Sequence, residues 1–285
     1  MGLPPKQVSK SSVSELVKAW HASPEWSAMK PSTRSDWNRY GQRIVEAWGD
    51  LEVRGIMPKP VIALRDRYAS APAAANNLLR CLSAMMHWAV PRDWRSDNPC
   101  REVEKLQIGE GYQPWPLDVV ASAREQLIAA GNDPLWWVLA FALYTGQRRG
   151  DVLAMRWDAL QCDLITVRQE KTGKLLTIPL HRDLREIVAT LPKRAVSILA
   201  TEAGQPWSNE RWKSAWRRQH PPAAARYVLH GLRKSVVVTL LEAGCTTAEV
   251  APITGQSHDM VEHYAKRVNQ KKLARAAMTR WEGSQ

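Results

Sequence analysis

The sequence is poor in cysteine, with four in 285 residues and no two of them close together. Cys81, Cys100, Cys162 and Cys245 form no C-x-x-C pair, and no histidine lies at the spacing of a shared zinc site. This spacing argues against a disulfide framework and against structural zinc. It is typical of a cytoplasmic protein whose thiols stay reduced.

Long apolar runs are also missing. No stretch approaches the length that spans a bilayer, and the opening residues MGLPPKQVSK have no apolar run behind their positive charges. We therefore expect no membrane association. The sequence also lacks a glycine-rich phosphate loop and a carboxylate cluster of the metal-binding type, so we expect neither a cofactor nor a metal ion.

Acidic residues are outnumbered. Asp and Glu total 28 against 40 Lys and Arg, a formal net charge of +12, while 45% hydrophobic residues are enough for folded cores. A basic folded protein most often binds a polyanion. Between residues 205 and 234 seven Lys or Arg stand against a single acid, Glu210. This excess predicts a phosphate-tracking surface, to which we assign Arg211, Lys213, Arg217, Arg218 and Lys234.

The hydrophobic pattern is helical along most of the chain. It predicts four or five helices in residues 11–103, the last over about 75–90. Residues 105–116 break the periodicity with two Gly and two Pro and have no apolar face, so we interpret them as an interdomain linker. Helices then resume, and the segment at 133–146 is apolar enough to be central in a core. Residues 163–180 alternate apolar and polar side chains around Thr172 and Gly173, which predicts a β-hairpin.

These segments predict a mainly α protein with a small β-hairpin or sheet. We place a helical domain at 1–104, a linker at 105–116 and a larger domain at 117–285. A polar connection after Tyr264 leads to a last helix at 269–281, whose narrow apolar stripe is formed by Leu273, Ala276, Ala277 and Trp281. The fourteen tryptophans mostly have the spacing of helix faces, so we interpret them as core residues and assign none to base stacking.

Two segments of the second domain are richer in polar side chains than a fold requires. In ALYTGQRRGDVLAMRW, Arg148 follows the apolar helix, and Asp151 lies three residues on, where its carboxylate can orient the guanidinium. In HGLRKSVVVTLLEAG, His230 and Arg233 share one helix face and can clamp a phosphate, Arg by charge and His by proton transfer. Each pair by itself is more typical of a solvated helix surface than of a catalytic site.

Their arrangement with two further segments is more specific. Lys171 lies at the hairpin turn, within EKTGK, and Tyr264 lies among polar residues in TGQSHDMVEHYAKR. The four segments resemble, in the same order, the signature boxes of the phage-integrase family of tyrosine recombinases. The first domain, with PAAANNLLRCLSAMMHWAV and DNPCREV, resembles the helical core-binding domain of that family.

The resemblance implies a helical core DNA-binding domain joined to a catalytic domain. It implies a site-specific recombinase that cuts and rejoins double-stranded DNA through a 3′-phosphotyrosine intermediate, with Tyr264 as the nucleophile. The catalytic set implied is Arg148, Lys171, His230, Arg233, Gln256 and Tyr264, supported by Asp151. It further implies a nucleoid-associated protein that assembles as a tetramer on DNA through its C-terminal helix, with an accessory directionality factor as a further possible partner.

One position departs from the family pattern. The family has histidine, or sometimes tryptophan, after a glycine shortly before the tyrosine, whereas this chain has Gly255-Gln256 and an interval to Tyr264 that is one residue shorter. Glutamine can donate a hydrogen bond to a phosphate oxygen but cannot carry a proton. His258 and His263 are near in sequence and could substitute for it, but we interpret both as surface histidines.

Three other functions are compatible with parts of this pattern. A type IB topoisomerase-like enzyme would use the same residues without exchanging strands. A DNA-binding regulator with a degenerate site would accommodate Gln256. A metal-dependent nuclease would require clustered acids, which the sequence does not provide. A covalent protein–DNA adduct formed in EDTA would exclude the regulator and the nuclease.

Overall fold

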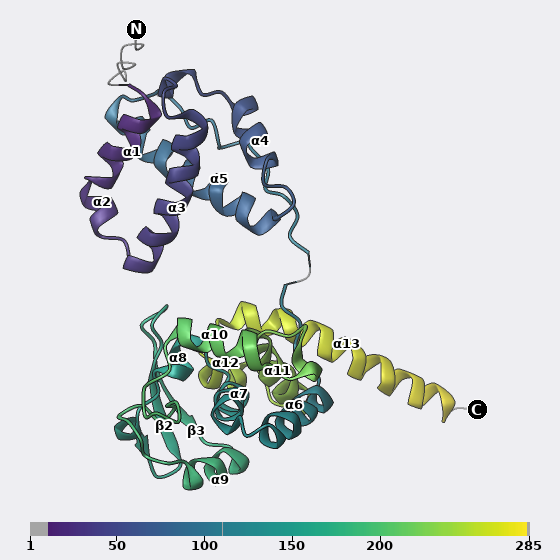
Figure 1. Cartoon of the computed structure of the whole chain (residues 1–285). Coiled ribbons are helices and arrows are strands. Elements are labelled where there is room, and N and C mark those ends of the chain that lie inside the picture. Colours follow the sequence, from purple (N-terminus) through teal and green to yellow (C-terminus); the bar gives the residue numbers. More distant parts are fainter. Residues whose placement is uncertain (1–10, 110, 284–285) are drawn as a thin grey trace. The chain divides into compact units, whose positions relative to one another are not determined.

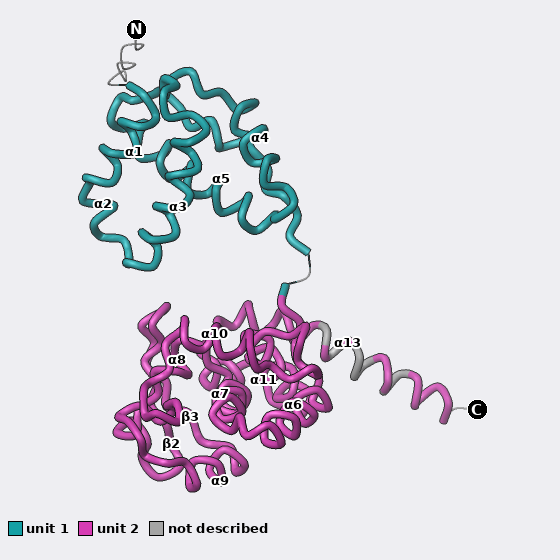
Figure 2. Tube along the Cα trace, in the orientation of Figure 1, with its two compact units in different colours: residues 1–111 teal, residues 112–285 magenta. Residues whose placement is uncertain are grey.

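The protein folds into two compact units. The computed structural model describes residues 11–109 and 111–283, except the side chains of Arg267, Asn269, Lys271, Lys272, Leu273, Ala276 and Ala277. Unit 1 comprises residues 1–111 and unit 2 residues 112–285 (Figure 2). The boundary falls within the segment 105–116. The expected fold class, mainly α with a small antiparallel sheet, is confirmed.

Unit 1 is helical throughout its described part. Four of its helices begin with a proline, which fits the first helical position because the missing N–H would be unpaired there in any case. The helix expected from about residue 75 therefore starts earlier, at Pro72, and it ends at Ala89. The helices are α1 (Val13–His21), α2 (Pro24–Ser27), α3 (Pro31–Trp48), α4 (Pro58–Asp66) and α5 (Pro72–Ala89), with 3-10 turns at Val53–Gly55 and Val90–Arg92.

The apolar stripes of these helices form one core. Leu16, Ile44, Leu82 and Met85 are all at most 1% exposed. Trp20 lies in the same core, 2% exposed, with its ring 4.9 Å from that of Trp26. Unit 1 thus has a hydrophobic core of its own, as an independently folded domain requires.

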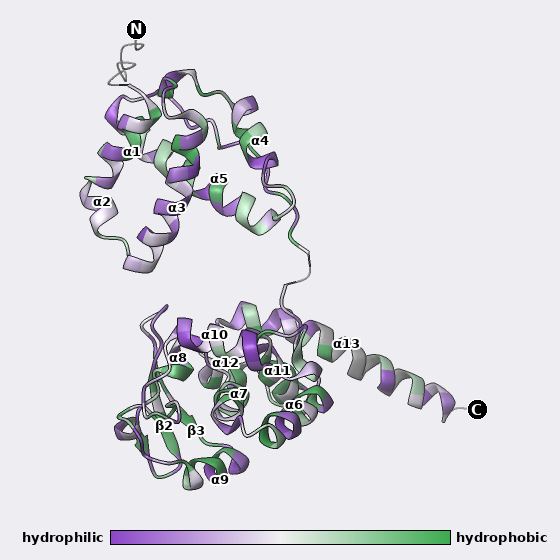
Figure 3. Ribbon diagram, viewed as in Figure 1, coloured by the Kyte–Doolittle hydropathy of each residue, from purple (hydrophilic) through white to green (hydrophobic). Residues whose placement is uncertain are grey.

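Unit 2 combines helices with a small sheet (Figure 1). Its helices are α6 (Leu117–Ala129), α7 (Asp133–Thr145), α8 (Arg149–Leu153), α9 (Arg182–Thr190), α10 (Asn209–Gln219), α11 (Leu229–Glu242), α12 (Thr247–Thr254) and α13 (His258–Glu282), with 3-10 turns at Trp157–Ala159 and Pro222–Ala224. Helix α7 is hydrophobic along most of its length (Figure 3) and packs against α6, α8, α9 and α11. The apolar segment at 133–146 therefore lies at the centre of the unit.

The sheet contains the expected hairpin and one short strand before it. Strands β1 (Leu160–Gln161), β2 (Leu164–Arg168) and β3 (Leu175–Pro179) pair antiparallel in that order. Leu164 pairs with Pro179 and Arg168 with Leu175, so residues 169–174 form the connection. Ile165 and Val167 face the core, as the alternation predicts.

The end of the segment expected to be a linker is packed into unit 2. Trp115 is 2% exposed; its backbone N–H donates to Ser235 Oγ at 2.7 Å, and its indole Nε1 donates to Val228 O at 2.8 Å. Gly231 leaves room for it, because a Cβ there would lie 2.7 Å from Trp115 Cδ1 and would collide with Gln113 O. The expectation that 105–116 has no apolar surface to bury is wrong for Trp115, because a single indole can be anchored without helical periodicity.

The last helix is not a separate element. α13 runs without a break from His258 to Glu282 and includes Tyr264. The expected polar connection is helical because the stretch AKRVNQKK contains good helix formers and neither Gly nor Pro. The C-terminal end of α13 extends away from the other helices of unit 2 (Figure 1), and Met278 and Trp281 are 50% and 61% exposed. Within residues 11–109 and 111–283, no helix has both the length and the apolar character needed to cross a bilayer.

Candidate active site

The end of α7 positions two arginines. The helix stops at Gly146, whose φ of +62° favours glycine, and the chain then extends so that Arg148 caps α8. A Cβ on Gly146 would lie 3.1 Å from Thr254 Cγ2, so the turn is closely packed as well. The Gly146 carbonyl accepts a hydrogen bond of 2.7 Å from Arg233 Nη1. The loop that carries Arg148 is thereby tied to α11.

Arg233 is a buried cation with an unsatisfied donor. It is 2% exposed, and its Nη2 has no hydrogen-bond partner among the described residues. Burial, and next the charge of Arg148, lower the pKa of Arg233 to about 10, while Asp151 and Tyr264 act in the opposite direction. The group stays positive at neutral pH. A buried guanidinium with an unpaired N–H destabilises the fold unless an anion accepts a hydrogen bond from it.

His230 lies one turn before Arg233 on α11. The side chain is exposed at the surface, but partial desolvation of the imidazole lowers its pKa, and the nearby positive charges of Arg233, Lys234, Arg148 and Lys171 lower it further. His230 is therefore neutral at physiological pH and can accept a proton. The influence of these four cations on one ring also shows that α8, α11 and the β2–β3 connection bring their charges to the same place.

Asp151 contacts both Arg148 and the hairpin connection. Its Oδ2 is 3.9 Å from Arg148 Nη1, beyond hydrogen-bond distance, whereas its Oδ1 accepts a bond of 2.8 Å from the backbone N–H of Glu170. The buried carboxylate therefore anchors the hairpin connection next to Lys171 and acts on Arg148 only through charge. Asp151 thus forms the ion pair with Arg148 that the i, i+3 spacing predicts, and it also holds the backbone of the hairpin connection.

A glutamine that the motifs do not include also contacts Arg148. Gln169 is fully buried, and its Oε1 accepts from Arg148 Nη1 at 3.1 Å and from Thr172 Oγ1 at 2.8 Å. Its Nε2 donates to Gln147 Oε1 at 2.7 Å and to Thr254 O at 3.0 Å. Gln169 therefore connects the first arginine, the hairpin tip and the end of α12. The alternating pattern of the strand could have indicated that Gln169 is buried, because residue 169 continues the inward-facing positions 165 and 167.

The segment after α12 packs directly on this network. Gly255 has a φ of +67°, and a Cβ there would lie 2.6 Å from Gln169 Nε2. Only glycine fits this position without displacing Gln169. Gln256 follows; its Oε1 is buried without a partner among the described residues, and its backbone N–H donates to Thr254 Oγ1 at 3.4 Å. The His258 and His263 side chains are both exposed.

Tyr264 lies in the second turn of α13. Its ring is half-buried beside the apolar cluster of α11, α12 and α13, with Lys234 Nζ 5.9 Å from the ring centroid. Burial raises the pKa of the phenol, and the charge of Arg233 opposes this. The same charge interaction acts on Arg233. The phenol and the buried guanidinium are therefore within range of electrostatic interaction.

The basic residues expected on one surface lie on two different faces of α10. Lys213 and Arg217 line a cavity together with His230. Arg211 and Arg218 lie on another side of the helix, where Arg211 bonds to Pro206 O and Gln205 Oε1, and Arg218 bonds to Ser214 Oγ. Helical spacing explains the separation, since 211 and 218 are two turns apart whereas 213 and 217 are one turn apart.

Replacing Gln169 by leucine tests its effect on Arg148. The substitution keeps the volume but removes every side-chain hydrogen bond, so we expect a loss of about 1–3 kcal/mol in unfolding free energy and at least ~10-fold slower strand cleavage, as for a displaced catalytic group. Gln147→Leu is the matched control, because Gln147 belongs to the same buried network without contacting Arg148. Single-turnover cleavage on saturating DNA, compared with thermal unfolding, separates the two effects. Equal cleavage losses in both variants would show that Gln169 serves only the fold.

The comparisons with known proteins identify the family and the fold. Residues 121–271 match the phage integrase family, and residues 13–106 match the phage integrase central domain. The matches define a site-specific tyrosine recombinase, an enzyme that breaks and rejoins DNA strands. The chain belongs to the phage integrase family. A comparison with curated protein sequences finds no match.

Solved integrase structures share the fold. Lambda integrase (residues 75–356), as a dimer bound to a COC′ core site, is 19% identical with a TM-score of 0.78, over 87% of this chain and 97% of that chain. A lambda integrase tetramer bound to a Holliday junction is 19% identical, with a TM-score of 0.76, over 88% and 75%. Tn1549 transposon integrase in complex with circular intermediate DNA is 15% identical, with a TM-score of 0.75, over 91% and 99%.

Proposed function

We propose that Tyr264 is the nucleophile with which this recombinase cuts one DNA strand and holds its 3′ end. The observation that supports this best is the buried Arg233, whose Nη2 has no partner among the described residues and which interacts electrostatically with Arg148 and Tyr264. A phosphodiester anion would satisfy that donor. Without a resident metal, fixed cations must neutralise the charge that repels a nucleophile.

The site residues then divide the reaction between them. Arg148 and Arg233 hold the non-bridging oxygens, while the Tyr264 oxygen attacks the phosphorus and its proton passes to neutral His230. The bond from phosphorus to the 5′ oxygen breaks, and Lys171 protonates the leaving oxygen. Gln256 can donate a hydrogen bond to a phosphate oxygen. The products are a 3′-phosphotyrosine and a free 5′ hydroxyl, and the reverse reaction on another strand rejoins the DNA.

A nicked suicide substrate incubated in EDTA tests this function. Sequencing of DNA fragments that survive repeated selection for binding supplies the recognition site first. Cleavage next to the nick releases a short fragment that diffuses away, so religation is not possible. The covalent adduct therefore accumulates and is seen as a shifted band in a denaturing gel. Binding without an adduct would favour the DNA-binding regulator, and cleavage only with added metal would favour the nuclease. An adduct without strand exchange between two sites would favour a topoisomerase-like enzyme.

We further propose that both units bind double-stranded DNA and that α10 supplies phosphate contacts. Each neutralised phosphate contributes about 0.9 to the slope of log K against log salt. The double variant Lys213→Ala/Arg217→Ala should therefore lower the slope by about 1.8, and we expect a similar loss for Arg211→Ala/Arg218→Ala. Arg185→Ala is the control, because this exposed arginine pairs with Asp163. Fluorescence anisotropy over a salt series measures the slopes; unchanged slopes in both double variants would contradict the surface.

Assembly on DNA is proposed to use the C-terminal part of α13. Met278 and Trp281 are exposed there, whereas the Leu273, Ala276 and Ala277 of the predicted stripe lie outside the described side chains. This surface is too small for a stable dimer in free solution, so we expect a monomer that becomes a tetramer on paired sites. A directionality factor would bind such a complex, which would be nucleoid-associated.

Truncation after Gln270 tests the assembly. The cut must keep Val268, which is 6% exposed and belongs to the core of α11, α12 and α13. We expect normal binding to one site and loss of the slow-migrating complex of two sites in a native gel, because the docking surface is gone. A truncated chain that still synapses and recombines would show that this part of α13 acts within its own subunit.

A further inference from the structure

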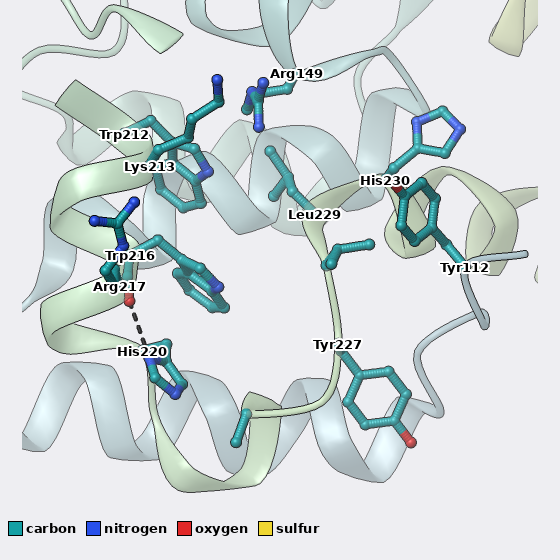
Figure 4. Close-up of a pocket in the computed structure, with 12 residues that line it drawn as sticks. Tyr112, Arg149, Trp212, Lys213, Trp216, Arg217, His220, Tyr227, Leu229 and His230 are labelled. Atoms are coloured by element: carbon teal, nitrogen blue, oxygen red, sulfur yellow. Dashed lines mark hydrogen bonds between the residues drawn. The ribbon is translucent and has the colours of Figure 1, made fainter. Parts of the chain in front are cut away.

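A cavity of about 580 Å³ lies next to the proposed active site. It is bounded by α10 on one side and by the segment 225–230 on the other, and its edge includes His230 (Figure 4). All the lining residues belong to unit 2. The proposed reaction uses only His230 among them, and Lys213 and Arg217 are assigned to phosphate contacts, so the aromatic part of the lining has no assigned role.

The walls of the cavity are aromatic. The rings of Trp212 and Trp216 are stacked, with centroids 5.3 Å apart and planes at 20°, and His220 lies 6.0 Å from Trp216. In Figure 4 the Trp216 and His220 rings point into the hollow from the α10 side, opposite Tyr227. Trp115 supports both walls from behind, with its ring 6.1 Å from Trp216 and 5.4 Å from Tyr227. The cavity is therefore built before any ligand arrives.

The rim of the cavity is cationic. Arg149, Lys213 and Arg217 line it, and no acidic residue is among the described residues that do so. Arg149 is held by a bond of 2.7 Å from its Nε to Asn209 Oδ1. A purely apolar ligand would not need these charges, and a phosphate alone would not need the indoles. A nucleotide matches both, since its base stacks on aromatic rings and its phosphates meet the cations.

The location of the cavity indicates which nucleotide it would bind. His230 acts at the scissile phosphate in the proposed function and also borders the cavity. A paired base inside a duplex has both faces covered, so it can reach an indole only by leaving the stack. We propose that the cavity receives one base of the bound DNA that has left the helix beside the scissile phosphate. This inference rests on the proposed function for its location, but not for the stacking itself.

Binding of a duplex with one unpaired base tests the proposal. A fluorescein-labelled duplex that carries a single-base bulge is compared with the fully paired duplex of the same sequence, using the full chain. We expect about ten-fold tighter binding of the bulged duplex, the effect of one base stacked on an aromatic side chain. Trp216→Leu and His220→Ala should lose this preference and keep the affinity for paired DNA, whereas Trp216→Phe should retain it.

Trp137→Leu is the matched control, because Trp137 is a partly buried tryptophan of the same unit that does not line the cavity. The proposal is wrong if the wild-type protein shows no preference, or if folded Trp216→Leu and His220→Ala both keep it. It is also wrong if thymidine monophosphate equimolar with the DNA removes the preference, because the cavity would then be a site for free nucleotides. Adduct formation by Tyr264 is measured separately, so failure of the proposed function and failure of this inference are distinguishable.

Discussion

Tyr264→Phe abolishes the covalent protein–DNA adduct and leaves DNA affinity nearly unchanged: this is the largest effect that we expect from a single substitution. The proposed reaction requires the phenol oxygen itself, which phenylalanine lacks. Affinity should persist because one hydroxyl contributes little to a charge-dominated interface. Stability should also persist, since the ring is half-buried beside the α11–α13 cluster and phenylalanine keeps that packing.

The measurement is adduct yield on the suicide substrate, together with the dissociation constant for the same DNA. Tyr144→Phe serves as a control, because Tyr144 donates its hydroxyl to Asp183 Oδ2 at 2.8 Å and plays no part in the proposed reaction. Undiminished cleavage by the Tyr264 variant would remove Tyr264 from the role of nucleophile. Cleavage lost together with DNA binding would point to a folding defect instead.

The positions of the site residues follow largely from local sequence rules. A glycine after an apolar helix predicts the turn that positions Arg148, and i, i+3 spacing puts His230 and Arg233 on one face of α11. Alternation predicts the hairpin that carries Lys171. These rules act within a few residues, which is why they can be applied without knowing the tertiary structure.

The contacts between the segments could not be predicted in the same way. Asp151 forms the expected ion pair with Arg148 three residues away, but its hydrogen bond comes from Glu170, nineteen positions along the chain. Gln169 has partners on α12 and in the loops before α8 and β3. Each such hydrogen bond depends on how separate elements pack, and local periodicity carries no information about that. The cavity beside α10 is another example: helical spacing correctly assigned Trp212 and Trp216 to the core, but it could not show that they also line a cavity.

The second large effect is expected for Arg233→Lys. The wild-type guanidinium uses Nη1 for the Gly146 carbonyl at 2.7 Å and keeps Nη2 without a partner among the described residues. A guanidinium can make both contacts at once because its donors are fixed in a plane, whereas a single ammonium at the end of a flexible stem is a point charge that is more strongly hydrated. Lysine therefore keeps the charge but loses either the tie to Gly146 or the contact to the phosphate.

Loss of one fixed donor to a developing anion typically slows an enzyme by about a hundred- to a thousand-fold, and we expect Arg233→Lys to slow cleavage by this amount. DNA affinity should change little, because the net charge is conserved. Single-turnover cleavage and anisotropy measure the two quantities, with Arg156→Lys as the matched control, since Arg156 forms an exposed ion pair with Asp158. If Arg233→Lys cleaved DNA at the wild-type rate, Nη2 would not hold the scissile phosphate, and the buried guanidinium would serve only to join α11 to the end of α7.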